Sequence, residues 1–313
     1  MQTYAIGIDI GATNTDIGLV RSDGQVLSHV ILSSQSYDQA APYMTDIANG
    51  IRKLMSDNNI ESITGIGIGA PNGNYQTGCI EENTANLRIK TQIPLGQMLS
   101  EQFNVPVKLD NDANAAALGE LVYGGAKGMK HFIMLTLGTG VGSGIVIDGR
   151  LLHGAHGAAG EIGHAIVEPN GRACSCGRKG CIETYASARG ICQTYIEEAA
   201  LAGKPLSDEE RANLTCKFVG ESANNGNLIA IRTYERTAYW IGLALANAAA
   251  FSEPEAIFLM GGPTRAGEAL MAPLRQYFDQ HLLFLYKDKI NVQLSKLNGN
   301  DAAILGAAAL STL

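Results

Sequence analysis

Four potential metal ligands lie close together in the segment HAIVEPNGRACSCGRKGCIE. Cys174, Cys176 and Cys181 have the spacing C-x-C-x4-C, and His164 precedes them. Three thiolates and one imidazole form a common closed tetrahedral zinc set, and the glycines between the cysteines let the chain fold around a small ion. The spacing is less standard than paired C-x-x-C motifs. A cluster of reduced thiols or a redox switch is therefore the alternative to zinc.

Two turns of small residues are suited to binding phosphate. Gly11 and Thr13 form the first turn, Gly138, Thr139 and Gly140 form the second, and each turn follows an apolar strand. Backbone N–H groups in such turns can approach a polyanion without side-chain clashes, and threonine hydroxyls add donors. A tight hairpin without a ligand is the alternative for either turn alone. The sequence contains neither a P-loop motif nor a complete dinucleotide fingerprint.

Carboxylates accompany these turns. Asp9 lies two residues before Gly11, where a carboxylate beside phosphate makes sense chiefly if Mg²⁺ or its waters lie between them. In the segment LDNDANAAALGE, Asn111 and Asp112 fall where a strand ends and a helix begins. One such residue could be a helix cap. A cap hardly explains Asp110, Asn111, Asp112 and Asn114 together. An amide and a carboxylate at the end of a strand suit a sugar, because the amide can bind hydroxyls and the carboxylate can take a proton from the attacking one.

The elements that must position these residues alternate between strands and helices, which favours an α/β fold. Strands are expected at residues 4–10, 16–20, 26–32, 62–69, 105–109, 256–260 and 289–294, and helices at 37–58, 94–103, 113–122, 186–202, 208–214, 223–252, 270–283 and 301–313. The segment HFIMLTLGTGVGSGIVIDGRLL repeats the pattern of AIGIDIGATNTDIGLVRSDGQVL: strand, glycine and threonine turn, strand, Asp-Gly turn and strand. We interpret this repeat as two similar lobes.

Composition excludes several classes of function. The chain has 313 residues and a net charge of −7 at pH 7, without a basic cluster, so we expect no nucleic-acid partner. No secretory signal is evident, and the apolar runs are shorter than the roughly 18–20 residues that a membrane span needs. We therefore expect a cytoplasmic protein without membrane contact. In that reducing compartment its six cysteines are thiols or metal ligands rather than disulfides.

The segments GEIGH and CSCGRKGCIETYAS resemble the signature of the ROK family of sugar kinases and repressors, most closely its bacterial glucokinase branch, and the resemblance extends from Asp9 to Gly306. It implies the two-lobed actin-like and hexokinase-like (ribonuclease H-like) α/β fold, with an active-site cleft between the lobes. We place the small lobe at residues 1–112 plus 301–313. The large lobe, with the zinc-binding loop, then covers residues 113–300.

The resemblance also implies roles for individual residues. The catalytic base would be Asp112. The sugar hydroxyls would bind to Asn86, Asn111, Asp112, Glu161, His164 and Glu183. ATP and its phosphates would bind to Asp9, Gly11, Thr13, Gly138, Thr139, Gly140, Gly261 and Gly262, with Gly306 near the adenosine pocket. A structural Zn²⁺ would bind to His164, Cys174, Cys176 and Cys181, so His164 would use one ring nitrogen for zinc and the other for the sugar.

The sequence departs from the family pattern at three places. Ala12 and Asn14 replace a glycine and a lysine of the first phosphate loop. The segment APNGNY replaces a Pro-Gly pair followed by an acidic residue, and Pro263 replaces a third glycine in the adenosine loop and removes one backbone donor. None of these changes affects the expected base.

The expected function is Mg²⁺- and ATP-dependent phosphorylation of a hexose at its 6-hydroxyl, with glucose as the first choice. N-acetylglucosamine, N-acetylmannosamine, fructose and allose are the alternative acceptors, and polyphosphate is an alternative donor. A sugar-responsive repressor would need a DNA-binding segment before the first phosphate loop, and a zinc hydrolase would need an open coordination position. We expect neither. A homodimer is the expectation from the family.

Overall fold

The computed structural model describes residues 2–84, 87–297 and 301–312. The chain divides into two compact units, each with its own core. The first unit comprises Met1–Met129, Leu151–Ala159 and Lys296–Leu313, and the second comprises Lys130–Arg150 and Gly160–Ser295. In the described ranges, none of the helices combines the length and the apolar character that crossing a lipid bilayer requires.

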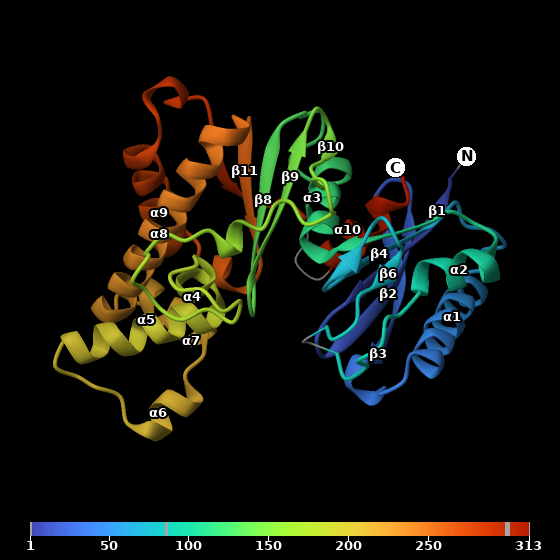
Figure 1. The fold of residues 1–313 in the computed structure, drawn as a ribbon, viewed down its shortest axis with the longest axis horizontal. Coiled ribbons are helices and arrows are strands. Elements are labelled where there is room, and N and C mark those ends of the chain that lie inside the picture. The colour runs from blue at the N-terminus through green and yellow to red at the C-terminus, as the bar shows by residue number, and fades with distance from the viewer. Residues whose placement is uncertain (1, 85–86, 298–300, 313) are drawn as a thin grey trace. The chain divides into compact units, whose positions relative to one another are not determined.

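The first unit is built on a five-stranded sheet of order β3-β2-β1-β4-β7 (Figure 1). Its strands are β1 (Tyr4–Ile10), β2 (Asn14–Arg21), β3 (Val26–Ser33), β4 (Ile66–Ala70) and β7 (Val107–Asn111). Strand β1 pairs antiparallel with β2 and parallel with β4, and β4 pairs parallel with β7. The short strands β5 (Gly73–Asn74) and β6 (Cys79–Ile80) form a separate hairpin. The carboxyl ends of β1, β4 and β7 therefore meet at one edge of the sheet.

Helices cover both faces of this sheet at its central strands, which explains why β1 and β4 are buried along nearly their whole length. They are α1 (Ala40–Asp57), α2 (Leu95–Phe103), α3 (Asp112–Val122) and α10 (Ala302–Leu310), with the short turn η1 (Ser34–Ser36) before α1. Ile8 and Ile68 face the core that α1 completes. On the other face, glycine at positions 7 and 67 allows α10 to approach the strands, because a Cβ atom there would collide with the backbone of α10.

The second unit repeats the same sheet plan with the order β10-β9-β8-β11-β12. Its strands are β8 (Phe132–Leu137), β9 (Val141–Ile147), β10 (Arg150–Leu151), β11 (Ala256–Met260) and β12 (Asn291–Leu294). As in the first unit, the central strand pairs antiparallel with the next strand of its hairpin and parallel with a later strand. The repeat expected from the sequence is thus confirmed, and the two glycine-containing turns occupy matching positions in two similar sheets.

Most helices of the second unit lie between β10 and β11 in the chain (Figure 1). They are α4 (Glu183–Ala186), α5 (Ala188–Leu201), α6 (Asp208–Asn213), α7 (Cys216–Asn224) and α8 (Leu228–Ser252); α9 (Glu268–His281) follows β11, and the single turns are η2 (Ile162–His164), η3 (Gly262–Ala266) and η4 (Phe284–Tyr286). Helix α8 packs against α5 and α9 and contributes Tyr234, Ile241 and Leu245 to the core.

Two expected helices are interrupted. The expected helix over residues 223–252 is wrong, because α7 ends at Asn224 and α8 begins at Leu228. Gly226 adopts φ +81° between them, and the Asn227 side chain caps α8 by accepting hydrogen bonds from the N–H groups of Ile229 and Ala230. The expected helix over 186–202 likewise divides at Ser187, whose side chain caps α5.

The contact pattern divides the chain differently from the expected boundary at residue 112. Helix α3 belongs to the first unit, because it packs against α10. Gly119 and Gly306 allow this close packing: a Cβ atom on Gly119 would lie 2.8 Å from the Cα atom of Gly306. Gly306 thus serves helix packing in the first unit, and its expected place near adenosine stays a prediction.

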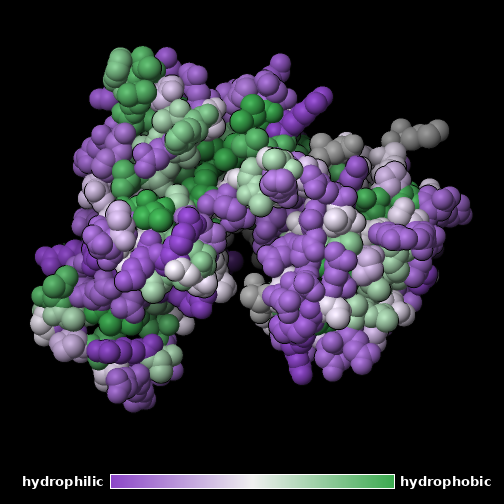
Figure 2. Space-filling model, viewed as in Figure 1, coloured by the Kyte–Doolittle hydropathy of each residue, from purple (hydrophilic) through white to green (hydrophobic). Residues whose placement is uncertain are grey.

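The face drawn in Figure 2 is mainly polar, with apolar areas between the polar side chains. The exposed apolar side chains of the second unit include Leu283, Phe284 and Leu285, which lie at and next to η4. Single apolar side chains are usual on folded surfaces, so these residues by themselves identify no partner.

Candidate functional site

The first glycine turn connects β1 and β2. The N–H of Gly11 donates to the carbonyl of Asn14 at 2.8 Å, which closes the turn, and the N–H of Ser34 donates to the carbonyl of Thr13 at 2.9 Å. Below the turn, the buried Thr15 hydroxyl bonds with the hydroxyls of Ser34 and Tyr43. Gln35 donates its side-chain amide to the carbonyl of Ala12. The turn therefore has one well-supported conformation, even with alanine in place of the family's second glycine.

Asp9 lies at the end of β1, and its carboxyl group has a strongly raised pKa. Burial, together with the smaller effects of the nearby carboxylates of Asp112 and Asp16, raises the pKa of Asp9 to about 7. A site that brings several carboxyl groups together and removes them from water favours a proton or a cation. Asp9 therefore fits the expected place of a divalent ion.

Replacing Asp9 with asparagine is expected to stabilise the ligand-free protein at pH 8 more than at pH 4. The native state of the wild-type protein holds the Asp9 proton up to about pH 7, whereas the unfolded chain loses it near 3.8. The free energy of unfolding of the wild-type protein therefore decreases by roughly 2–4 kcal/mol as the pH rises from 3.8 to 7. The asparagine variant has no such loss, so its advantage in urea-unfolding midpoint should grow through this pH window.

Asp38→Asn is the matched control, because this exposed carboxylate lies in the same unit. Its midpoint should follow that of the wild-type protein at each pH. If Asp9→Asn changed the midpoint by the same amount at pH 4 and pH 8, the proposed proton on Asp9 would be contradicted.

Asn111 and Asp112 begin α3 at the end of β7. The Asn111 side chain accepts a hydrogen bond from the N–H of Ala113 at 2.9 Å and caps the helix, and the Asp112 carboxylate accepts from the same N–H at 2.8 Å. The Asp112 carboxyl group reaches solvent, yet burial by the protein around it raises its pKa, partly offset by the backbone N–H groups of Ala113 and Asp112. A carboxyl group with a raised pKa at a helix N-terminus is suited to accept a proton.

Asp110 forms a hydrogen-bond network with Asn111, at the end of β7, and with Asn114 of α3. Asp110 is 3% exposed and accepts hydrogen bonds from the N–H of Asn111 at 2.7 Å and from the side chain of Asn114 at 2.8 Å. Nε2 of His153 lies 2.6 Å from the other Asp110 oxygen, and the His153 ring stacks on Tyr75 at 3.7 Å between ring centroids. Sequence reasoning missed His153, because no local pattern pairs it with Asp110.

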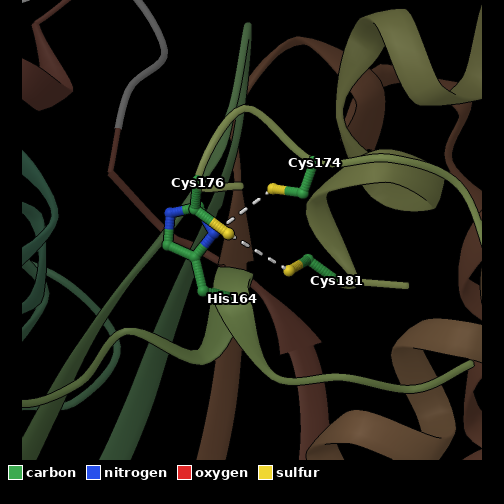
Figure 3. Close-up of side chains that lie close together, drawn as sticks. All are labelled: His164, Cys174, Cys176 and Cys181. Carbon is green, nitrogen blue, oxygen red and sulfur yellow. Dashed lines mark hydrogen bonds between the residues drawn. The ribbon is translucent and has the colours of Figure 1, made fainter. Parts of the chain in front are cut away.

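The four expected metal ligands are brought together in the second unit (Figure 3). Their ligand atoms all lie within 4.8 Å of one another. Sγ of Cys174 is 3.6 Å from Nδ1 of His164, and Sγ of Cys176 is 3.6 Å from Sγ of Cys181. Ligands about 2.3 Å from a tetrahedral metal ion are about 3.8 Å apart. The side chains thus fit a closed four-coordinate site, with Nδ1 of His164 as the ligand atom.

Charge and backbone geometry suit this cluster to a metal. Arg178 lies beside Cys176 and lowers the pKa of this thiol to about 6, which favours the thiolate that binds metal. Arg178 also donates to the backbone carbonyl of His164 at 2.9 Å. Gly180 adopts φ +73°, and a Cβ atom there would collide with the carbonyl of Glu168. Glycine at this position therefore lets the chain fold back on itself before Cys181.

Arg172 anchors the segment that carries the ligands. Its guanidinium donates to the carbonyls of Thr184 and Gly190 at 2.7 and 3.1 Å, pairs with Glu197 at 2.8 Å and lies 4.6 Å from the centroid of the Tyr185 ring. These partners belong to α4 and α5. The cysteine loop is therefore attached to the helices beside it. No sequence pattern marked Arg172 for this role.

The second glycine turn connects β8 and β9 and resembles the first. The N–H of Gly138 donates to the carbonyl of Gly140 at 2.9 Å. Gly261, at the end of β11, adopts φ +109°, and a Cβ atom there would collide with the backbone of Leu137. Gly262 begins η3 with Pro263 after it. Within the second unit, the expected phosphate and adenosine turns therefore adjoin one another.

The structure places the expected site residues in two groups. The first unit holds Asp9, Gly11, Thr13, Asn111 and Asp112, and the second holds Gly138, Thr139, Gly140, Glu161, His164, Glu183, Gly261, Gly262 and the cysteines. Glu161 is exposed just before η2, and His164 ends η2. Asn86 lies outside the described residues.

Several known proteins are similar to this chain in sequence and in fold. The model of the ROK family matches residues 5–312. A protein named glucokinase from Halalkalibacterium halodurans is 37% identical, over 97% of this chain and 93% of its own length. A glucokinase from Thermotoga maritima is 34% identical, over 97% and 96%. The structure of a ROK family glucokinase from Streptomyces griseus with glucose and AMPPNP is 30% identical and covers 98% of both chains, with a TM-score of 0.80. The chain therefore belongs to the ROK family.

Proposed function

We propose that the protein is a glucokinase, which transfers the γ-phosphoryl group of ATP to the 6-hydroxyl of glucose. The observation that carries this proposal is the position of Asp112, a carboxylate with a raised pKa at the first residue of α3. The similarity to proteins named glucokinase supports the choice of glucose.

In the proposed reaction, Asp112 accepts the proton of the 6-hydroxyl as its oxygen attacks the γ-phosphorus in line, and the bond from that phosphorus to the β-phosphate oxygen breaks. The Asp110 network holds Asn111 and, through Asn114, the first turn of α3, which contains Asp112. Asn86, Asn111, Glu161, His164 and Glu183 are the proposed ligands of the sugar hydroxyls. Gly11, Thr13, Gly138, Thr139 and Gly140 supply turns for the phosphates, and Gly261 and Gly262 supply the adenosine turn.

Two metal ions belong to the proposal. Mg²⁺ neutralises phosphate charge when it is bound, and Asp9, with its raised pKa, would hold it or its water ligands. Zn²⁺ would bind His164, Cys174, Cys176 and Cys181. Because four protein ligands close the coordination shell, this ion would hold structure and perform no chemistry. The family resemblance extends the proposal to a homodimer in the cytoplasm.

A coupled kinase assay tests the substrate. With ATP and Mg²⁺, glucose should give the highest kcat/KM in a panel that also contains N-acetylglucosamine, N-acetylmannosamine, fructose and allose. Replacing ATP by polyphosphate tests the donor, and we expect ATP to be preferred. A higher kcat/KM for an N-acetylhexosamine would reassign the acceptor. If none of the sugars were phosphorylated with either donor, the proposed function would be wrong.

A further inference from the structure

Glu183 faces the second glycine turn as well as the metal-binding segment. It is the first residue of α4 and lies two residues after Cys181. Its Oε2 atom accepts a hydrogen bond from the N–H of Val141 at 3.1 Å, and Val141 directly follows Gly140. The family resemblance gives Glu183 a role toward the sugar only. This contact connects it to the turn proposed for the nucleotide phosphates.

The absence of a side chain at Gly140 leaves room for the Glu183 carboxylate. A Cβ atom at this position would lie 2.6 Å from Oε2 of Glu183. No real Cβ atom makes so short a contact, so any other residue here would displace the carboxylate. The turn and the carboxylate are therefore fitted to each other.

The same chain segment contacts the turn at two more points. The N–H of Ala188, at the start of α5, donates to the carbonyl of Gly138 at 2.8 Å. In η2, Gly163 packs directly against the backbone of Val141, because a Cβ atom on Gly163 would collide with the Val141 carbonyl. Gly163 immediately precedes the metal ligand His164. All of these contacts are internal to the second unit, and they hold the turn between η2 and the beginning of α5.

We propose that Glu183 is a positioning residue for the second phosphate turn, and that it links donor binding to acceptor binding through one carboxylate. The inference rests on the proposed sugar kinase function. The N–H of Val141 donates to Oε2 of Glu183, and Oε1 of Glu183 makes no hydrogen bond to a residue that the structure describes. A carboxylate has enough acceptor sites to bind the N–H of Val141 and a sugar hydroxyl at the same time. A sugar held by the free oxygen would therefore favour the side-chain position that also holds the turn, and each substrate would strengthen binding of the other.

Three variants separate this role from a sugar contact alone. Glu183→Ala removes the acceptor, Glu183→Gln keeps an oxygen for Val141 without the charge, and Glu161→Ala removes a proposed sugar ligand without a side-chain bond to the turn among the described residues. The measurements are calorimetric affinity for the Mg²⁺ complex of a non-hydrolysable ATP analogue without sugar, KM for MgATP and for glucose, and metal content.

Glu183→Ala should weaken binding of the analogue by about tenfold, equivalent to about 1.4 kcal/mol, and should raise both KM values. Glu183→Gln should bind the analogue within about twofold of wild type, as a retained hydrogen bond requires. Glu161→Ala should raise only the KM for glucose. Wild-type affinity for the analogue in a metal-loaded Glu183→Ala variant would overturn the inference. Failure of the wild-type protein to bind the analogue or to phosphorylate a sugar would instead contradict the proposed function.

Gly140→Ala gives a second test if Glu183→Ala does not fold or loses metal. Its Cβ atom would push the Glu183 carboxylate away while Glu183 itself is kept. The inference predicts that this substitution in the phosphate turn also raises the KM for glucose. A Gly140→Ala variant that loses only nucleotide affinity would overturn it.

Discussion

Asp112→Asn is expected to lower kcat for glucose phosphorylation by roughly 10²- to 10⁴-fold, the usual contribution of a positioned general base. Asparagine has nearly the same shape and can still accept the N–H of Ala113 through its amide oxygen. The fold and the binding of glucose should therefore change little, and the loss should fall on kcat rather than on KM. Steady-state kinetics with glucose and ATP, with thermal unfolding as a check on the fold, measures this effect.

The pH profile gives an independent test of the same residue. Burial raises the pKa of Asp112, so its ionised form is lost at a higher pH than for an ordinary carboxyl group with a pKa of 3.8. The wild-type kcat/KM should therefore begin to fall on the acid side above that ordinary range. Asp57→Asn, which removes an exposed carboxylate of α1, should keep both the rate and the profile. A wild-type rate in the Asp112→Asn variant would eliminate the assignment.

Cys176→Ala is expected to lose the bound metal, weaken glucose binding by about tenfold or more and lower the unfolding temperature by roughly 5 °C or more. The exposed Cys176 supplies one of four ligand atoms, so its loss opens the site. Nδ1 of His164 then loses the ion that orients the ring, and the loop that leads to Glu183 is released. Metal analysis, calorimetric titration with glucose and thermal unfolding measure the three effects.

Cys192→Ala is the matched control, since this thiol lies in α5 outside the cluster. It should retain metal and glucose affinity. A Cys176→Ala variant without metal but with wild-type glucose affinity would show that the ion does not orient the sugar ligands. Retained metal would show that the remaining three side chains suffice to bind it.

The parts of the fold that the sequence predicted are those with a local cause. The two hairpins were recognised because an Asp-Gly turn and a glycine turn recur with apolar runs between them. The break between α7 and α8 was missed, although Asn225, Gly226 and Asn227 form a local stop and cap signal, because the alanine-rich pattern after it concealed the boundary. The place of α3 could not be predicted. It depends on packing between Gly119 and Gly306, which are far apart in the chain.

The same distinction applies to the candidate site. The clustering of His164, Cys174, Cys176 and Cys181 could be predicted because they lie within one short segment. The contacts of Asp110 with His153 and of Val141 with Glu183 join residues 43 and 42 positions apart, and no periodicity links them. Arg172 is similar, since two of its partners are backbone carbonyls, which leave no trace in the sequence.

The two similar sheets differ in the length of one connection, and this difference affects how a new acceptor specificity could arise. In the first sheet, residues 34–65 connect β3 to β4. In the second sheet, the corresponding connection from β10 to β11 comprises residues 152–255. The proposed metal ligands, Glu161 and Glu183 all lie in this longer connection, whose counterpart in the first unit is much shorter. Substitutions in this longer connection would change the proposed acceptor ligands while both glycine turns were preserved. The bond from Glu183 to Val141 limits that independence, so a change of acceptor at Glu183 would also have to preserve the donor turn.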